Sequence, residues 1–187
     1  CLFRTCYDVA LYPVSITNVE QSNSRTSSNV DVTIAAEYGQ ELSRLKMDAL
    51  RFYLHGEVHV TRTLYLWLFR YLDYIELDVG GGYKHKLPAS SIKPVGFGDD
   101  EAILPYGTNS FAGYRLLQEY FSLPEKFMFF DVTGLEWLSG VPQRSTVKMS
   151  FVFKRALPSE VVLKDKHLRL HCTPCLLYTS PSPRDLT

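Results

Sequence analysis

Apolar and polar residues alternate along several parts of the chain, and a period of two residues is typical of strands with one buried face. Val30, Val32 and Ile34, for example, are separated by polar residues. Residues 127–132 are nearly all apolar, as in a strand buried on both faces. The pattern predicts strands over these ranges: 30–34, 45–54, 74–79, 127–132 and 146–155, with 161–163 and 168–172 closing the sheet.

Residues 58–72 carry the strongest helical pattern. Apolar side chains recur there at the spacing of one helix face, namely at Leu64, Trp67, Leu68, Tyr71 and Leu72. The rest of the helix surface is also apolar, at Tyr65, Leu66 and Phe69. Two interpretations remain open: a helix buried in the core on more than one side, or a helix with one face left for a partner or a missing domain.

A second helix is predicted to run to about residue 121. The hydroxyl of Ser110 is placed to accept a first-turn amide, and Pro124 ends the helix because the residue before proline leaves the α region. Arg115 and Glu119 are one turn apart and are expected to form a surface pair. One face is expected to be buried, through Tyr114, Leu117 and Phe121.

Three consecutive glycines at 80–82 follow a predicted strand. A phosphate-binding loop would need Gly-Lys-Ser/Thr opening a helix, whereas an extended segment follows here, so a hairpin turn is predicted. Together the elements predict an α+β fold with a mainly antiparallel sheet and two main helices.

The composition supports a folded domain and excludes some partners. The chain has 187 residues, of which 45% are hydrophobic and 13% aromatic. Its 20 Lys and Arg balance its 20 Asp and Glu, so it lacks the basic surface expected of a nucleic-acid-binding protein. No segment reaches the roughly 18 apolar residues that span a bilayer, and no direct membrane insertion is expected.

An acidic loop is the first candidate for chemistry. Asp99, Asp100 and Glu101 stand close to Tyr106. Paired carboxylates can perform acid–base chemistry when their pKa values are split by their surroundings. Adjacent residues point their side chains apart, however, so an exposed loop that contacts a partner is the preferred interpretation.

A His-x-Glu-x-His string, formed by His55, Glu57 and His59, is the second candidate. A zinc protease site needs His-Glu-x-x-His on one helix, and here the Glu is misplaced. The string supports only an alternative function, a metal-dependent hydrolase that would also use Asp99, Asp100 or Glu101. We expect no catalytic, metal or cofactor site.

Residues 87–136 resemble the TssF family of type VI secretion baseplate subunits. The specific parts are KPVGF at 93–97, GYRLLQEYF at 113–121 and PEKF at 124–127. Further stretches resemble the same family: FRTCY at 3–7 with LYPV at 11–14, LRFYLHG at 50–56 and LRLHCTP at 168–174.

The resemblance implies a structural subunit without catalytic residues. Such a protein joins TssG-like and TssK-like partners in the wedges of a cytoplasmic baseplate, which docks on the inner-membrane complex of a bacterial contractile injection system. A TssE-like protein, the sheath and the spike hub are further implied partners. The expected role is to hold the wedge together and seed the sheath.

The last residues depart from the family pattern. Residues 1–174 are expected to be an internal fragment of a TssF-like protein, whereas 175–187 resemble one reading frame of a sequencing adapter and are expected to pack against nothing. If Cys175 belongs to that tail, it cannot complete a zinc site with Cys172. Cys6 and Cys172 are then expected to be reduced and buried.

Overall fold

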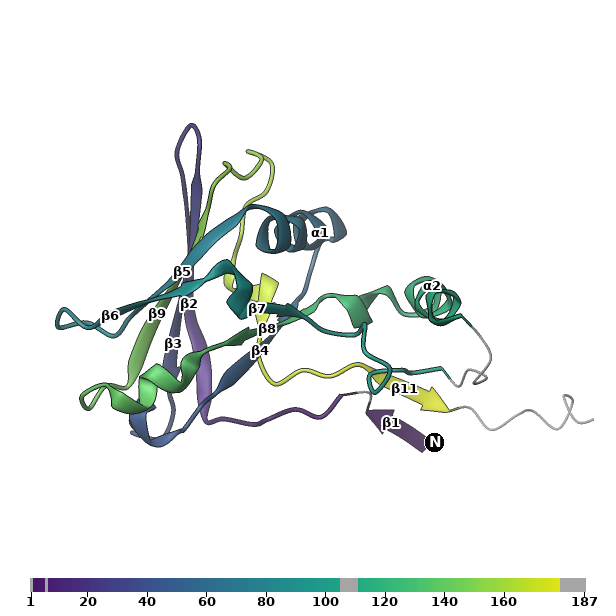
Figure 1. Ribbon diagram of the computed structural model, residues 1–187, viewed down its shortest axis with the longest axis horizontal. Coiled ribbons are helices and arrows are strands. Elements are labelled where there is room, and N and C mark those ends of the chain that lie inside the picture. Colours follow the sequence, from purple (N-terminus) through teal and green to yellow (C-terminus); the bar gives the residue numbers. More distant parts are fainter. Residues whose placement is uncertain (1, 6, 105–110, 179–187) are drawn as a thin grey trace, which may run out of the picture.

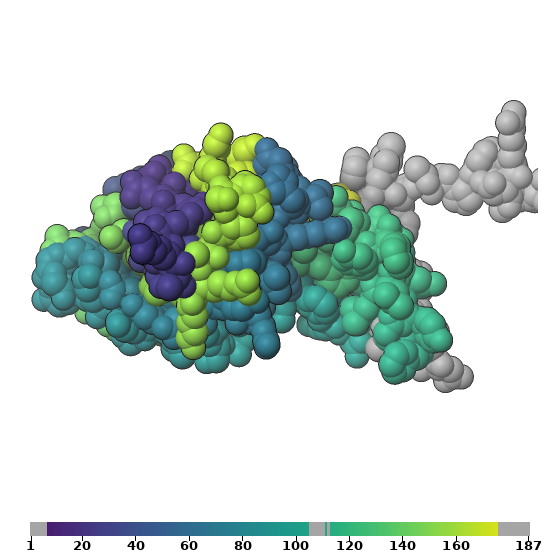
Figure 2. Space-filling model, turned by 90° about the horizontal axis from the view of Figure 1, so that it is seen from above, coloured from purple at the N-terminus to yellow at the C-terminus, as the bar shows by residue number. Residues whose placement is uncertain are grey.

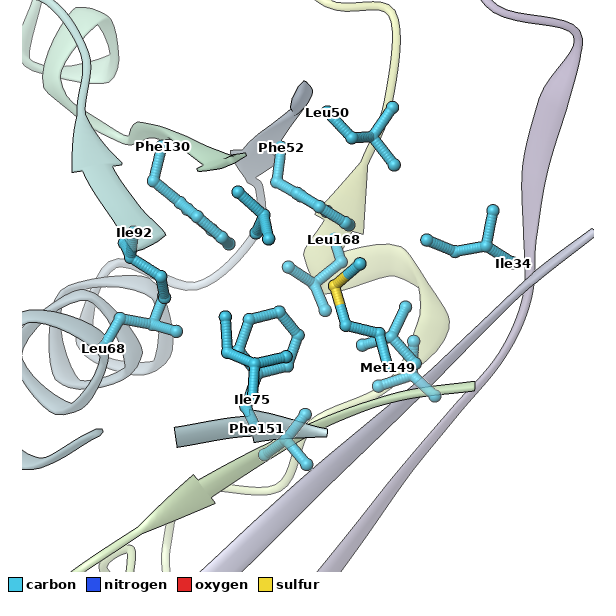
Figure 3. Close-up of a cluster of buried hydrophobic side chains, with 14 of the residues drawn as sticks. Ile34, Leu50, Phe52, Leu68, Ile75, Ile92, Phe130, Met149, Phe151 and Leu168 are labelled. Carbon is cyan, nitrogen blue, oxygen red and sulfur yellow. The ribbon is translucent and has the colours of Figure 1, made fainter. Parts of the chain in front are cut away.

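Two antiparallel sheets face each other across the core (Figures 1 and 3). The computed structural model describes residues 2–5, 7–104 and 111–178. The larger sheet has the strand order β2 (Val14–Asn23), β3 (Ser28–Ala36), β9 (Thr146–Phe153), β5 (Leu72–Asp78) and β6 (Lys84–Pro88). The smaller has the order β10 (Leu168–Arg169), β4 (Ala49–Leu54), β8 (Phe129–Thr133) and β7 (Ile92–Pro94).

The alternation predicted from the sequence sets which face of each strand is buried. Val30 and Val32 of β3 lie opposite Phe151 and Met149 of β9, and all four side chains are buried. A register slip by one residue would expose the whole set, so this pairing is strongly specified.

Aromatic rings join the two sheets (Figure 3). Phe52 of β4 stacks on Phe130 of β8 with 5.2 Å between ring centroids. Phe151 of β9 approaches both rings edge-on, at 6.4 and 6.3 Å. Such edge-to-face pairs add to the energy of burial, and they fix how the sheets pack.

Helix α1 (Val58–Leu66) continues as a π-helical turn (Trp67–Tyr71) directly into β5. Leu64, Leu68 and Leu72 are buried against the sheets, whereas Leu66 is 50% exposed. The predicted helix is therefore confirmed except that Leu72 already belongs to the strand. One side of it fills the core, and the other side is open.

Short 3-10 turns connect several elements: Leu42–Arg44, Ala89–Ser91, Pro124–Phe127, Leu135–Gly140 and Asp165–His167. The predicted hairpin at residues 80–82 joins β5 and β6. All three glycines have positive φ there, between +65° and +84°, which explains why side-chain-free residues occupy the turn.

The edge of the smaller sheet differs from the prediction. Leu168–Arg169 pairs with β4 as β10, but residues 161–163 form no strand. Instead the Gln21 side chain donates to the carbonyl oxygen of Val161 (3.0 Å) and accepts from the amide of Leu163 (2.9 Å). A side chain thus satisfies the backbone groups that a neighbouring strand would have used.

A separate two-stranded sheet pairs β1 (Leu2–Thr5) with β11 (Cys175–Tyr178). The prediction that everything from Cys175 onward packs against nothing is therefore wrong for Cys175–Tyr178. The sequence pattern failed because the β1 partner is distant in the chain. Residues 179–187 lie outside the described residues. Cys172 is a free thiol that is half-buried, not fully buried as expected, and burial raises its pKa. Cys6 lies outside the described residues.

Helix α2 (Ala112–Ser122) and β11 lie at one end of the molecule and the β5–β6 hairpin lies at the other, with α1 between them (Figure 1). Helix α2 stands beyond the sheets, at the end of the molecule where β1 and β11 also lie (Figure 1). In the space-filling view its segment forms a lobe beside α1 (Figure 2).

Candidate partner-contact surface

Helix α2 is turned opposite to the prediction. Tyr114, Leu117 and Phe121 are 67%, 55% and 81% exposed, so the expectation that this face is buried is wrong. The buried residues are Arg115 and Glu119, at 2% and 1% exposed, and the expectation of a surface pair is wrong too. Ser110, the predicted cap, lies outside the described residues. The helix thus buries charge and exposes apolar surface.

Glu119 is held by a buried counter-charge and by backbone amides. Its carboxylate contacts the ammonium group of Lys126, which is 0% exposed and lies in the 3-10 turn after α2. Its other oxygen accepts from the amides of Ile103 (2.7 Å) and Leu104 (3.2 Å). Burial acts to raise the pKa of Glu119, but the bonds from Lys126 and the two amides outweigh it and lower the pKa.

Arg115 binds the start of the acidic loop. Its guanidinium donates to the carbonyl oxygen of Gly98 and to the Asp99 carboxylate, both at 3.0 Å. Arg115 and Glu119 therefore fasten α2 to both parts of the segment 98–104. These contacts explain why the polar face of α2 turns inward: its partners in the segment 98–104 lie 15 or more residues away in the chain, beyond any local pattern.

The candidate acidic residues have different roles in this loop. The carboxylate of Glu101 is half-buried and accepts from the amides of Gly96 (2.7 Å) and Gly98 (2.9 Å), which closes the turn. Asp99 is exposed but bound to Arg115, and Asp100 is exposed. Tyr106 lies outside the described residues. Asp100 is therefore the exposed acid of this loop that does not pair with Arg115.

An apolar groove of about 430 Å³ runs between α1 and α2. Its lining is almost entirely apolar and comes from α1, the loop before residue 98, α2 and the turn that follows: Arg62, Tyr65, Leu66, Phe97, Leu116, Leu117, Tyr120, Phe127 and Met128. Burial raises the pKa of Tyr65 to about 12. Leu117 lines this α1–α2 groove and also belongs to an exposed apolar row on the outward side of α2, formed with Tyr114 and Phe121. The groove and this row therefore adjoin.

The His-x-Glu-x-His string does not form a metal site. Glu57 accepts a hydrogen bond from His167 Nε2 at 2.7 Å and pairs with Lys166 at 2.6 Å. His167 Nδ1 accepts from the Lys164 amide, so Nε2 carries the proton. These bonds lower the pKa of Glu57 to about 2.

Within the described ranges, no three His, Cys, Asp or Glu side chains are grouped so that they could hold a metal ion. Glu57 is therefore engaged in a structural contact, and the hydrolase alternative has no support. The described residues also include no helix long and apolar enough to cross a bilayer.

Known proteins are similar to this chain in both sequence and fold. The family described as "Type VI secretion system, TssF" matches residues 1–176. The type VI secretion system component TssF1 of Pseudomonas aeruginosa is 31% identical over 149 residues, covering 72% of this chain and 24% of that protein.

A chain of the solved TssK-TssF-TssG baseplate subcomplex superposes with a TM-score of 0.80 at 28% identity, covering 93% of this chain and 33% of that chain. These similarities define a component of a type VI secretion system. Within that class, the chain belongs to the TssF family. It spans about a quarter of the length of the Pseudomonas relative.

Proposed function

We propose that this chain is part of a structural subunit of the type VI secretion baseplate. In this role it assembles with TssG-like and TssK-like proteins in a wedge on the cytoplasmic side of the inner-membrane complex. The wedge in turn contacts a TssE-like protein, the sheath and the spike hub, and it seeds the contractile sheath. Family membership supports the proposal, as does the likeness to the TssK-TssF-TssG subcomplex.

The single observation in this structure that carries the proposal is that buried charged side chains fix the shape of an exposed acidic loop. Arg115, Glu119 and Lys126 bind neighbouring elements of the same chain and hold the acidic loop in one shape. A loop held in this way presents Asp100 without further ordering, which lowers the entropic cost of binding. This suits a scaffold, whose work is to present fixed surfaces.

The loop is proposed to contact the TssG-like partner through charge. Asp100 is the suitable residue for the test, because charge reversal at Asp99 would place a lysine against Arg115 and disturb the loop itself. Loss of a rim charge weakens association mainly through the on-rate and its salt dependence. Asp100→Lys should therefore slow association, and the effect should shrink at high salt.

The experiment uses the full-length parent protein, co-expressed with the TssG-like and TssK-like proteins of its own gene cluster. The wild type should co-purify with both partners. Asp100→Lys should bind the TssG-like protein less tightly at low salt, whereas Glu160→Lys, which reverses an exposed charge on another loop, should bind normally.

Each failure has a distinct meaning. Equal binding by both variants would remove the acidic loop from the interface. A well-folded wild-type parent that co-purifies with neither partner would contradict the proposed function itself.

A further inference from the structure

We propose that the α1–α2 groove, together with the adjoining apolar row of α2, is the docking site for another segment of the same TssF-like chain, outside the residues present here. The occupant is an apolar segment with a carboxylate beside its apolar stripe. This inference rests on membership of the TssF family but not on any partner proposed above.

The first argument is the amount of apolar surface. Phe111, Tyr114, Leu117 and Phe121 follow one another at helical spacing on the outward side of α2 and are each more than half exposed. Of these, Leu117 also lines the groove, and the half-exposed Leu66 of α1 lines it as well. Soluble proteins rarely leave a contiguous apolar surface of this kind uncovered, so an occupant is expected.

The second argument is where the rest of the chain must attach. The aligned part covers only 24% of the Pseudomonas relative, so most of a TssF-like chain lies outside these residues. Residues 2–5 and 175–178, near the two ends of the described chain, pair with each other at the α2 end of the molecule (Figure 1). The flanking segments of the parent therefore leave from the same end of the molecule as α2, which forms one wall of the groove.

Covalent attachment favours such a segment over a separate partner. A tethered segment binds at an effective concentration set by its linker, in the millimolar range for a short one. An intermolecular partner has no such advantage at the groove.

The third argument is charge. Helix α1 and its π-helical turn, residues 58–71, contain Arg62 and Arg70 but no Asp or Glu. Both arginines are exposed, and the Arg62 guanidinium lies 5.9 Å from the centre of the Tyr120 ring at the groove. A carboxylate at the edge of the occupant would meet Arg62, whereas a lysine or arginine there would be repelled.

Hydroxyl-radical footprinting of the wild-type, full-length parent tests the proposal without any substitution. Tyr114 and Tyr38 are matched probes, because both are tyrosines and are 67% and 87% exposed in this chain. In the 187-residue chain the two should be oxidised at comparable rates. In the full-length parent alone, Tyr114 should be oxidised several-fold more slowly than Tyr38.

Three results would overturn the proposal. Tyr114 oxidised as fast as Tyr38 in the parent, both alone and after its partners are added, would mean that the groove stays open. Protection that appears only when the TssG-like or TssK-like protein is added would assign the groove to that partner and leave the proposed function standing. Protection that is lost on dilution would assign it to a second copy.

A pair of variants in the full-length parent gives an independent check. Leu117→Asp should restore the oxidation of Tyr114, because a buried unpaired carboxylate excludes an apolar occupant. Leu117→Met should keep the protection. Continued protection in Leu117→Asp would show that something other than groove occupancy shields Tyr114.

Discussion

Replacing Lys126 with methionine should destabilise the chain strongly. Lys126 is fully buried, and its ammonium group neutralises the buried carboxylate of Glu119. Methionine fills a similar volume but leaves that carboxylate with only the amides of Ile103 and Leu104 as partners. Removing one member of a buried ion pair costs about 3–5 kcal/mol, and we expect Lys126→Met to fall in this range near pH 7.

The pH dependence of this cost provides a check on its cause. In the wild type the pKa of Glu119 lies below its ordinary value of 4.5. Its contribution to stability is therefore present above pH 4.5 and is lost as the pH falls through the lowered pKa. Without Lys126, burial should raise that pKa, and the carboxyl can take up a proton. The stability difference between wild type and variant should thus shrink as the pH falls toward about 4.

Urea unfolding followed by tryptophan fluorescence measures the cost, and the double variant Glu119→Gln/Lys126→Met is the control. Glutamine keeps a carbonyl oxygen for the Ile103 amide and carries no charge. The double variant should be more stable than Lys126→Met alone, with a coupling energy of about 1–3 kcal/mol. A cost below about 1 kcal/mol for Lys126→Met, or additive effects of the two changes, would refute the reasoning.

Three further predictions concern other parts of the chain. Phe121→Ala should change the free energy of unfolding of the 187-residue chain by less than about 0.5 kcal/mol, whereas Phe130→Ala, fully buried, should cost about 3–5 kcal/mol in the same assay. Gly56→Ala should cost about 1–3 kcal/mol, because the residue has φ +116° and a Cβ would lie 2.8 Å from the His167 ring; a neutral result would show that the loop relaxes. The contribution of Glu57 to stability is present above pH 4.5 and is lost as the pH falls through its lowered pKa of about 2. The free energy of unfolding of Glu57→Gln should therefore fall less than that of the wild type between pH 4.5 and pH 2.

The sheets could be predicted from the sequence because their pattern is local. Val30, Val32 and Ile34 alternate with polar residues, and all three are buried. The α+β class, the hairpin at residues 80–82 and the end of α2 before Pro124 followed from similarly local signals. The pairing of β11 with β1 did not, since it joins segments that are far apart in the chain.

The orientation of α2 could not be predicted because the helix carries two coherent faces. One joins Tyr114 and Phe121, and the other joins Arg115 and Glu119. Burial of the apolar face is the usual outcome, and only long-range partners reverse it. Lys126 lies outside the helix, after a proline, and its ion pair with Glu119 forms only because the intervening turn brings the two side chains together.

The buried charges at α2 are better explained by orientation than by stability. Apolar replacement of a buried ion pair is often neutral or stabilising, so Glu119 and Lys126 are a costly way to hold a helix. They do, however, pair the polar face of α2 with charged and backbone groups inside the domain, and the opposite face with Tyr114 is then left outside. If this is their role, Glu119→Gln/Lys126→Met should allow α2 to turn its apolar face inward. In the 187-residue chain, hydroxyl-radical oxidation of Tyr114 should then fall relative to Tyr38, and an unchanged ratio would show that the ion pair does not select the orientation.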